Sequence, residues 1–431
     1  MIIVIGGGPA GRMSALRLAA AGKEVTILEK RALGGQCVHD GCMLVCGLND
    51  AARALRNARF LKERGIVSGE ISIRYPELID KLEDVQSKLA HILERETKDA
   101  GVKIEYGVTA EVRDGKVFVN DELREAESVV IAAGGEMNVP DIEGANLCGT
   151  YTARTIKTMR ELPKRMVIVG GGISAAEFAY IYSAFGVEVT LLARSKLLSV
   201  LPESFMKAVH RDLADVEIFE DVELEKIIGA DKVKGVVFNG NTIACDAVLF
   251  ATGIKPVSPY VTGIDKNSDG SIKVDENMET SIKGVYAAGD ILGAPYFTPV
   301  SRLQGFAAAD AILGSPRKVD LSQVPFCVVL GLDYMVCPAI ESGVTYSSYN
   351  IAGPDSFWHV ADGSVGSMHL TVDKDSGKIL GFASSGPSTS IVGTYLGYLV
   401  RKGVTVHEFS PMLEVHPMSD GLYSLIRFAD E

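Results

Sequence analysis

The sequence lacks the features that mark membrane proteins and secreted, disulfide-rich proteins. It contains no run of about 18 uncharged apolar residues, which a membrane-spanning helix would need. Seven cysteines among 431 residues are too few, and odd in number, for a disulfide framework. A short-range cysteine cluster in a reducing compartment is typical of catalysis or metal binding, so we expect a cytoplasmic protein.

Positively charged residues are fewer than negatively charged ones, with 43 lysines and arginines against 55 aspartates and glutamates. The formal net charge is −12, which argues against nucleic acid or an anionic membrane as a partner, because both require a basic surface. The chain begins MIIVIGGG, which predicts a buried strand from the second residue, so we expect no signal peptide. A chain of this length exceeds one ordinary hydrophobic core and predicts two to four domains.

What the sequence does contain is a repeat, in the segments that begin at Ile2 and Met166. Each copy has an apolar strand, a glycine turn, an amphipathic helix and a second apolar strand. That order predicts a βαβ unit and hence a parallel sheet. The recurring glycines are Gly6, Gly8 and Gly11 in the first copy and Gly170 and Gly172 in the second, where Ala175 takes the third place. Glycines at this spacing let a pyrophosphate approach the backbone and the helix N-terminus, so both copies predict dinucleotide binding.

The two copies differ at the end of the second strand, where the ribose of the nucleotide is recognised. Glu29 ends the strand in the first copy, and a carboxylate there can accept hydrogen bonds from both ribose hydroxyls. The equivalent residue in the second copy is Ala193, followed by Arg194 and Lys196. Two cations beside an alanine suit a 2′-phosphate, so we expect NADPH rather than NADH in the second copy. The alternative is that both cations are merely solvated.

Beyond the repeats, strands and turns continue to the C-terminus. The segments 129–135 and 247–253 each predict a buried strand ending in glycine, and Asp290 emerges after a further strand in 284–291. From about Val319 onward, short alternating strands and a helix from about Ser390 predict an antiparallel α+β domain.

The stretch GGQCVHDGCMLVC places three cysteines close together. In a regular helix Cys37 and Cys42 would lie about 8.6 Å apart at Cα, whereas a disulfide needs about 4.4–6.8 Å. A disulfide between these two cysteines would therefore require an interruption of the helix, and Gly41 is the natural place for it. The residues after Cys42 predict a helix whose N-terminus would lower the pKa of that thiol.

The third thiol, Cys46, has three interpretations. Residues four apart on a helix lie about 6.2 Å apart on one face, within disulfide reach on distance alone. Cys46 could therefore be a resolving thiol that exchanges with Cys42. The other two interpretations are a small apolar side chain that fills space in place of the lysine, and a metal or cluster site that Cys46 forms with Cys37 and Cys42. The C-x₄-C-x₃-C spacing differs from the plant-type ferredoxin run, and we predict no resident metal.

Together these motifs resemble the pyridine nucleotide–disulfide oxidoreductases, the group of glutathione reductase, dihydrolipoamide dehydrogenase and mercuric reductase. The family's active-site run is G-G-x-C-x-x-x-G-C-x-P-x-K. The matching residues are Gly34, Gly35, Cys37, Gly41 and Cys42, while Leu44 replaces the proline and Cys46 replaces the lysine. The resemblance implies FAD in the first domain, a pyridine nucleotide in the second, a smaller central domain and a C-terminal domain that forms a homodimer.

The resemblance also implies roles for single residues. Cys37 would attack the substrate disulfide, and Cys42 would lie against the flavin and pass electrons to it. Asp290 matches the aspartate that reaches the ribityl chain of FAD. Glu177 matches a glutamate that the family pairs with the missing lysine. Without that cation, Glu177 would either be protonated or be paired with another cation.

Near the C-terminus, EVHPMSDGLY is similar to the family's His-Pro acid–base segment. His416 matches the histidine, which would shuttle a proton to the leaving thiol in the active site of the other subunit. The family places a glutamate five residues later, where this chain has Gly421. If the loop is one residue shorter, Asp420 takes that place.

The predicted fold class is α/β, with two Rossmann-like dinucleotide-binding domains and a C-terminal α+β dimerisation domain. The predicted divisions are 1–149 for the first part of the FAD domain, 150–266 for the NAD(P)H domain, 267–318 for a central FAD-contacting segment and 319–431 for dimerisation. We expect an FAD enzyme that passes hydride from NADPH through Cys37–Cys42 to a small disulfide or related acceptor. The alternatives are a mercuric-type metal-ion reductase and a slow redox-sensing flavoprotein that uses Cys46.

Overall fold

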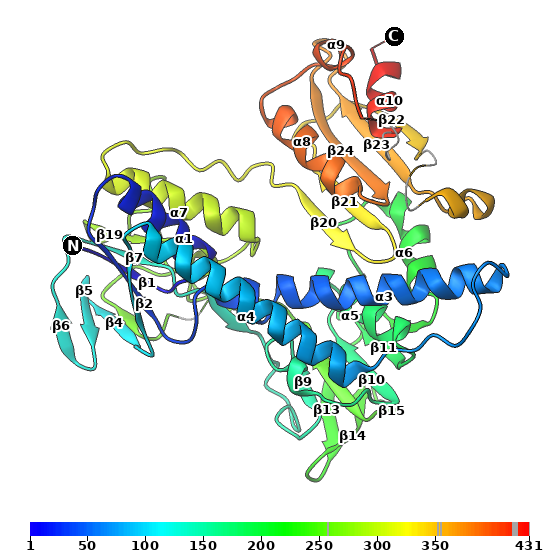
Figure 1. Ribbon diagram of the computed structural model, residues 1–431, viewed down its shortest axis with the longest axis horizontal. Coiled ribbons are helices and arrows are strands. Elements are labelled where there is room, and N and C mark those ends of the chain that lie inside the picture. The colour runs from blue at the N-terminus through cyan, green and yellow to red at the C-terminus, as the bar shows by residue number, and fades with distance from the viewer. Residues whose placement is uncertain (257, 351–352, 354–355, 416–420, 431) are drawn as a thin grey trace.

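The computed structural model describes residues 1–256, 258–350, 353, 356–415 and 421–430 (Figure 1). In this part of the chain no helix is both long and apolar enough to cross a membrane.

The first βαβ repeat forms the centre of a parallel sheet with strand order β19-β7-β1-β2-β3. Its strands are β1 (Ile2–Ile5), β2 (Val25–Glu29), β3 (Lys103–Tyr106), β7 (Ser128–Ile131) and β19 (Val285–Ala287). Strands β1 and β2 are buried at every position, as expected for a parallel strand covered on both faces. The helices of this region are α1 (Pro9–Ala20), α2 (Gly35–His39), α3 (Cys42–Glu63), α4 (Tyr75–Asp99) and α7 (Thr298–Ile312).

The second repeat forms a parallel sheet of the same kind, with order β12-β11-β10-β16-β9. Its strands are β9 (Thr150–Thr152), β10 (Arg165–Val169), β11 (Glu188–Leu192), β12 (Val216–Phe219) and β16 (Ala247–Phe250), and its helices are α5 (Ile173–Ala184) and α6 (Met206–Asp212). Ile2 pairs with Val25 in the first sheet as Met166 pairs with Val189 in the second. The sequence repeat is therefore a structural repeat with the same register.

Smaller β elements surround these sheets. They are β4 (Ala110–Arg113), β5 (Lys116–Val119), β6 (Glu122–Arg124), β8 (Gly135–Met137), β13 (Leu224–Gly229), β14 (Val233–Phe238), β15 (Asn241–Ala244), β17 (Ile254–Pro256) and β18 (Val261–Thr262). These elements pair antiparallel except for β18, which pairs with β4 in parallel. The 3-10 helices are η1 (Ile156–Thr158), η2 (Glu203–Phe205), η3 (Asp290–Leu292) and η4 (Phe357–Asp362).

The C-terminal region is an antiparallel sheet of order β20-β21-β24-β23-β22 with helices beside it. It contains β20 (Phe326–Val329), β21 (Asp333–Cys337), β22 (Val344–Tyr349), β23 (Ser367–Val372), β24 (Ile379–Gly386), α8 (Thr389–Arg401), α9 (Val406–Phe409) and α10 (Gly421–Phe428). This is the α+β arrangement that the alternating pattern predicts, and the predicted α/β fold class is confirmed. The exact domain divisions stay a prediction.

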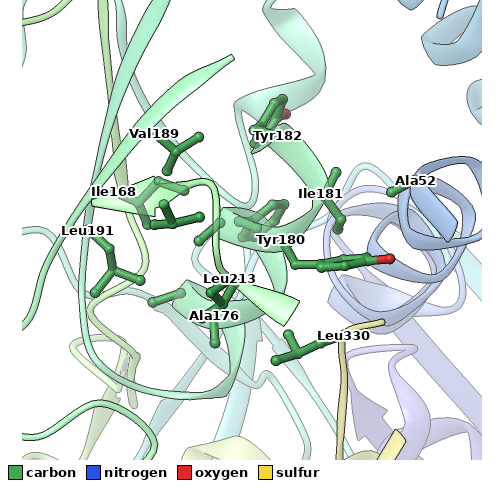
Figure 2. Packing of buried hydrophobic residues seen from close by; sticks show 14 of the residues in the cluster. Ala52, Ile168, Ala176, Tyr180, Ile181, Tyr182, Val189, Leu191, Leu213 and Leu330 are labelled. Atoms are coloured by element: carbon green, nitrogen blue, oxygen red, sulfur yellow. The ribbon is translucent and has the colours of Figure 1, made fainter. Parts of the chain in front are cut away.

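Helix α5 joins the three regions. Nine of its twelve residues are buried, because its faces pack against β10 and β11, against α3, and against the segment after β20. Figure 2 shows Ile168 and Leu191 on one side of α5 and Ala52 of α3 on the other, with Leu330 close by. The position of α3, which begins at Cys42, is thereby fixed relative to the second sheet.

Polar contacts fix α3 against the C-terminal sheet as well. Asn49 Nδ2 donates to the Val329 carbonyl at 2.6 Å, and Arg53 Nε donates to the Leu330 carbonyl at 2.6 Å. Arg53 Nη2 also forms an ion pair of 2.7 Å with Asp333. In Figure 1, α3 extends from the N-terminal sheet toward the C-terminal sheet, so one helix connects the cysteine segment to both other regions.

Candidate redox and nucleotide sites

The cysteine segment is interrupted where the sequence predicts. Helix α2 ends at His39, and α3 begins at Cys42. Between them Asp40 and Gly41 leave the helical conformation, with ψ of −1° and −115°. The expected irregularity at Gly41 is confirmed, and it brings two thiols to one place although they are five residues apart.

Cys37 and Cys42 meet at the hydroxyl of Thr298, the first residue of α7. Thr298 Oγ1 lies 3.4 Å from Cys37 Sγ and 3.5 Å from Cys42 Sγ. Both cysteines are free thiols in this structure. Sequence reasoning missed Thr298, and the available signal was a Thr-Pro pair at the start of a helix shortly after the strand that leads to Asp290.

The environments of the two thiols differ. A hydrogen bond from Cys37, joined by one from Thr298, lowers the pKa of Cys42 to about 6, against the effect of burial. The same hydrogen bond and burial raise the pKa of Cys37. The predicted direction for Cys42 is therefore right, but its main cause is the neighbouring thiol rather than the N-terminus of α3. Cys42 is the sulfur of the pair that ionises first.

Cys46 lies one turn farther along α3, with an exposed side chain. Although the side chain is exposed, partial desolvation of its sulfur raises the pKa of Cys46, and negative charge on Cys42 and Glu177 adds to this effect. Within the described ranges, no three His, Cys, Asp or Glu side chains are arranged to hold a metal ion.

Glu177 of α5 lies in the same neighbourhood, partly buried. Its Oε1 accepts a hydrogen bond of 3.1 Å from the backbone N–H of Val329. Among the described residues it has no ion-pair partner, and burial, opposed by this hydrogen bond, raises its pKa to about 7. Of the two predicted outcomes, protonation is the one that this environment favours, because Arg53 is committed to Asp333.

The first glycine turn suits a dinucleotide. Gly6 has a φ of +98°, and a Cβ there would lie 2.4 Å from the carbonyl oxygen of Ala132, so only glycine fits. Helix α1 begins beside this turn with no side-chain cap and no acidic residue in its first turn, which leaves its N–H groups free for phosphate. A Cβ on Gly35 would lie 2.8 Å from Cα of Gly8, so the cysteine segment lies directly against the turn.

Two carboxylates flank this turn. Glu29 is buried, and its oxygens accept the N–H groups of Gly7 and Arg31 at 2.7 Å each. A carboxylate has about four acceptor positions, so capacity remains for ribose hydroxyls. Asp290 begins η3 and accepts a hydrogen bond of 3.3 Å from Ser301, and burial raises its pKa. The residues present therefore fit FAD.

The second glycine turn repeats the first with one change. Gly170 has a φ of +141°, and α5 again begins without a side-chain cap beyond Gly172. Ala193 is fully buried against Gly171. Lys196 forms ion pairs with Glu220 and Asp221 at 3.0 and 2.9 Å, so its charge is already balanced.

Arg194 is exposed and has no ion-pair partner in the described part of the chain. It is therefore the cation at this turn that remains for a phosphate. His416 and Asp420, the predicted acid–base pair, lie outside the described residues.

A cavity of about 490 Å³ lies behind the cysteine segment and is lined by residues of α4 and by Arg31, His39 and Lys157. A second cavity, of about 480 Å³, separates α3 from η4 and α6. Two of the arginines that line it, Arg53 and Arg56, form ion pairs with Asp333 and Asp215. These pairs connect α3 to β21 and to the segment after α6.

Known proteins resemble this chain over almost its whole length. It is 29% identical over 432 residues to the uncharacterized protein MJ0636 of Methanocaldococcus jannaschii, covering 99% of this chain and 97% of the relative. It is 26% identical over 444 residues to a dihydrolipoyl dehydrogenase of Bacillus subtilis, covering 96% and 93%. The structure of the HOCl-induced flavoprotein disulfide reductase RclA from Escherichia coli has the same fold, with a TM-score of 0.85, 23% identity and 99% coverage of both chains.

The profile of the pyridine nucleotide-disulphide oxidoreductases matches residues 1–305, which include both glycine turns and the cysteine pair. The chain therefore belongs to this family, whose members are flavoprotein enzymes that work with FAD and a pyridine nucleotide.

Proposed function

We propose that the protein reduces a small disulfide or related acceptor with electrons from NADPH, through a redox disulfide formed by Cys37 and Cys42. The observation that carries the proposal is the shared hydroxyl of Thr298, 3.4 and 3.5 Å from the two sulfurs. The pKa of Cys42 is lowered and that of Cys37 is raised, although both thiols contact the same hydroxyl. One thiol of the pair is therefore ionised while the other keeps its proton, which allows the two sulfurs to take different roles in disulfide exchange.

The two sulfurs divide the work. FAD held at the α1 turn would supply the chemistry that links hydride from the nucleotide to reduction of the disulfide. Cys42, whose thiolate is the more stable, would be the sulfur that takes up electrons from it. Cys37, after losing its proton, attacks the acceptor disulfide and forms a mixed disulfide. Cys42 then displaces the second substrate thiolate, so that one NADPH and one proton convert one disulfide to two thiols.

The cofactors are held by the two glycine turns. For FAD we assign the phosphates to the N-terminus of α1, the adenosine ribose to Glu29 and the ribityl chain to Asp290. For NADPH we assign the pyrophosphate to the N-terminus of α5 and the 2′-phosphate to Arg194. The buried alanine at position 193 supports the second assignment, because a carboxylate there would repel that phosphate.

A homodimer completes the proposal. Ile391, Tyr395 and Tyr398 of α8 are 63%, 70% and 62% exposed, and their spacing puts them on one face of that helix. Exposed apolar faces of this kind mark protein interfaces. In such a dimer, His416 of one subunit would donate a proton to the leaving substrate thiol in the active site of the other subunit. We assign to Asp420 the role of orienting the His416 imidazole.

One observation favours a second candidate function, a slow redox sensor. Cys46 is exposed and one turn from Cys42, where it could receive the disulfide. Its raised pKa opposes this role, because a thiol exchanges only as thiolate. No described feature favours a mercuric-type metal-ion reductase over these two.

Anaerobic titration with NADPH tests the proposal. We expect a thiolate-to-flavin charge-transfer band after two electrons, and turnover with at least one small disulfide. Cys37→Ser should keep the band and lose turnover, whereas Cys42→Ser should lose both. The proposal would be refuted if the protein binds no FAD. It would also be refuted if the number of titratable thiols per chain does not rise by two when NADPH reduces the oxidised protein. A reduced protein that no disulfide reoxidises would support the sensor.

A further inference from the structure

Asp40 lies inside the redox segment, two residues before Cys42, and its side chain is 2% exposed. Burying a carboxylate is unfavourable unless charged or hydrogen-bonding groups surround it. Three cations do so here. Arg31 donates a hydrogen bond to Oδ2, and Arg154 Nε and Lys157 Nζ each lie 3.7 Å from the carboxylate. The cations come from the segment after β2 and from the turn and η1 that follow β9.

The backbone next to Asp40 is held as well. Lys157 Nζ donates to the carbonyl of His39 at 3.0 Å. Gln86 of α4, itself buried, donates to the carbonyls of Val38 and His39 at 2.9 and 3.1 Å. The end of α2 is therefore fixed by side chains from two other segments. This is where the helix must stop for Cys42 to approach Cys37.

Asp40 is the shared ion-pair partner of these three cations. One carboxylate faces three cations, and the buried Nε of Arg154 makes no hydrogen bond with any described residue. Two residues of chain span at most about 7 Å between Cα atoms, so the backbone that Asp40 holds is the backbone that positions Cys42. The charged or titratable groups that bear directly on the two sulfurs are Arg302, Asp290, Cys46 and Glu177.

We propose that Asp40 is a positioning residue for the redox pair. It fixes the interruption between α2 and α3 that brings Cys37 to Cys42, and it offsets the cations that this anchoring brings near the sulfurs. The inference rests on the proposed function, since it concerns how the same thiols are tuned. It makes Arg31, Arg154 and Lys157 parts of the redox site, although Arg154 and Lys157 are more than 100 residues away from it in sequence.

The proposal is tested by the sign of a pH shift. The FAD-bound protein is reduced with NADPH, and the pH midpoint of thiolate formation is measured from the charge-transfer band and from the rate of alkylation by iodoacetamide. Asp40→Asn removes a negative charge, so we expect the midpoint to fall by about 0.5–1 pH unit. The thiolate fraction below the midpoint should then rise about three- to tenfold. Lys157→Gln and Arg154→Gln should move the midpoint upward, and Asp40→Asn combined with Lys157→Gln should restore it.

Asp310 provides a matched control. It is 3% exposed and is held by two cations, Arg17 at 2.7 Å and Arg317 at 3.0 Å, near the far end of α7 from Thr298. Asp310→Asn should lower stability as the loss of a buried charge does, and should leave the midpoint unchanged. A merely structural role for Asp40 would make the two aspartate variants behave alike.

The outcomes separate the two levels of inference. If the wild-type protein shows the band but Asp40→Asn and both cation variants share its midpoint, the role of Asp40 is refuted and the proposed function stands. If the wild-type protein shows no band and no NADPH-dependent thiols, both fall together. Should Asp40→Asn fail to fold, the upward shifts in Lys157→Gln and Arg154→Gln decide the matter.

Discussion

The backbone N–H of Val329 donates a hydrogen bond of 3.1 Å to Glu177 Oε1, at a position where the family places a lysine–glutamate ion pair. A neutral amide stabilises a carboxylate less than a cation does, and it does not remove the net charge. The carboxylate of Glu177 is therefore free to exchange its proton near neutral pH, where its pKa has been raised to about 7.

This proton should control flavin reduction. As the pH rises through about 7, Glu177 loses its proton, and the negative charge that it gains would make a flavin bound nearby harder to reduce. We expect the rate of flavin reduction by NADPH to fall roughly threefold or more between pH 6 and pH 8. Glu177→Gln, which is neutral throughout, should show a flat profile. Stopped-flow absorbance measures both, and a wild-type profile retained in the glutamine variant would contradict the assignment.

The hydroxyl of Thr298 should stabilise the thiolate of Cys42. Thr298→Val has nearly the same shape and removes both contacts with sulfur. A hydrogen bond to a charged group contributes about 1.5–3 kcal/mol, so we expect the pH midpoint of the charge-transfer band to rise by about one unit. Thr298→Ser retains a hydroxyl and should titrate like the wild type. Equal midpoints in the valine and serine variants would exclude this role.

Replacing the third thiol should have little effect. Burial and neighbouring negative charges raise the pKa of Cys46, so it is a poor nucleophile at neutral pH. We expect Cys46→Ser to keep turnover within about twofold and to lose one titratable thiol without changing the number that NADPH generates. Loss of turnover, or of an NADPH-generated thiol, would instead identify Cys46 as a resolving thiol.

Nucleotide preference should depend on Arg194. Arg194→Ala removes the cation that has no ion-pair partner among the described residues, and we expect the KM for NADPH to rise about tenfold, with the KM for NADH unchanged. Lys196→Ala is the comparison, and it should have a smaller effect because Glu220 and Asp221 already balance that charge. Similar KM values for NADPH and NADH in the wild-type enzyme would count against a 2′-phosphate site.

The link between α3 and the C-terminal sheet should be important for stability. Arg53→Met leaves the buried Asp333 without its ion-pair partner, and we expect a loss of about 2–3 kcal/mol in the free energy of unfolding. Arg160→Met breaks an exposed pair with Asp80 and should leave stability nearly unchanged. Urea unfolding of the two variants compares them directly.

Local patterns were sufficient for much of the fold. The strand–glycine–helix order around Gly6 and Gly170 could be read from the local spacing, because a positive φ at each turn favours glycine. The carbonyl oxygens that also exclude a Cβ there, of Ala132 and Ala251, lie just after strands that are distant in sequence. The interruption at Gly41 followed from helix geometry alone. Both inferences concern segments whose conformation is decided within a few residues.

Contacts between segments that are distant in sequence could not be predicted from local patterns. The Thr-Pro pair at Thr298 does not reveal that its hydroxyl lies against Cys37, which is 261 positions away. Two of the three cations around Asp40, Arg154 and Lys157, are likewise more than 100 positions from it. The ion pairs of Lys196 with Glu220 and Asp221 likewise could not be read from the sequence, which offered Lys196 as a cation for a 2′-phosphate.

Residue order was enough to identify two nucleotide-binding units, a cysteine pair separated by a helix break, and a glutamate, Glu177, that lacks the family's lysine. Which groups surround the sulfurs and that carboxylate became visible only in the folded chain. Backbone geometry is set by short-range sterics, whereas pKa values and charge balance depend on the side chains that folding brings within a few ångströms.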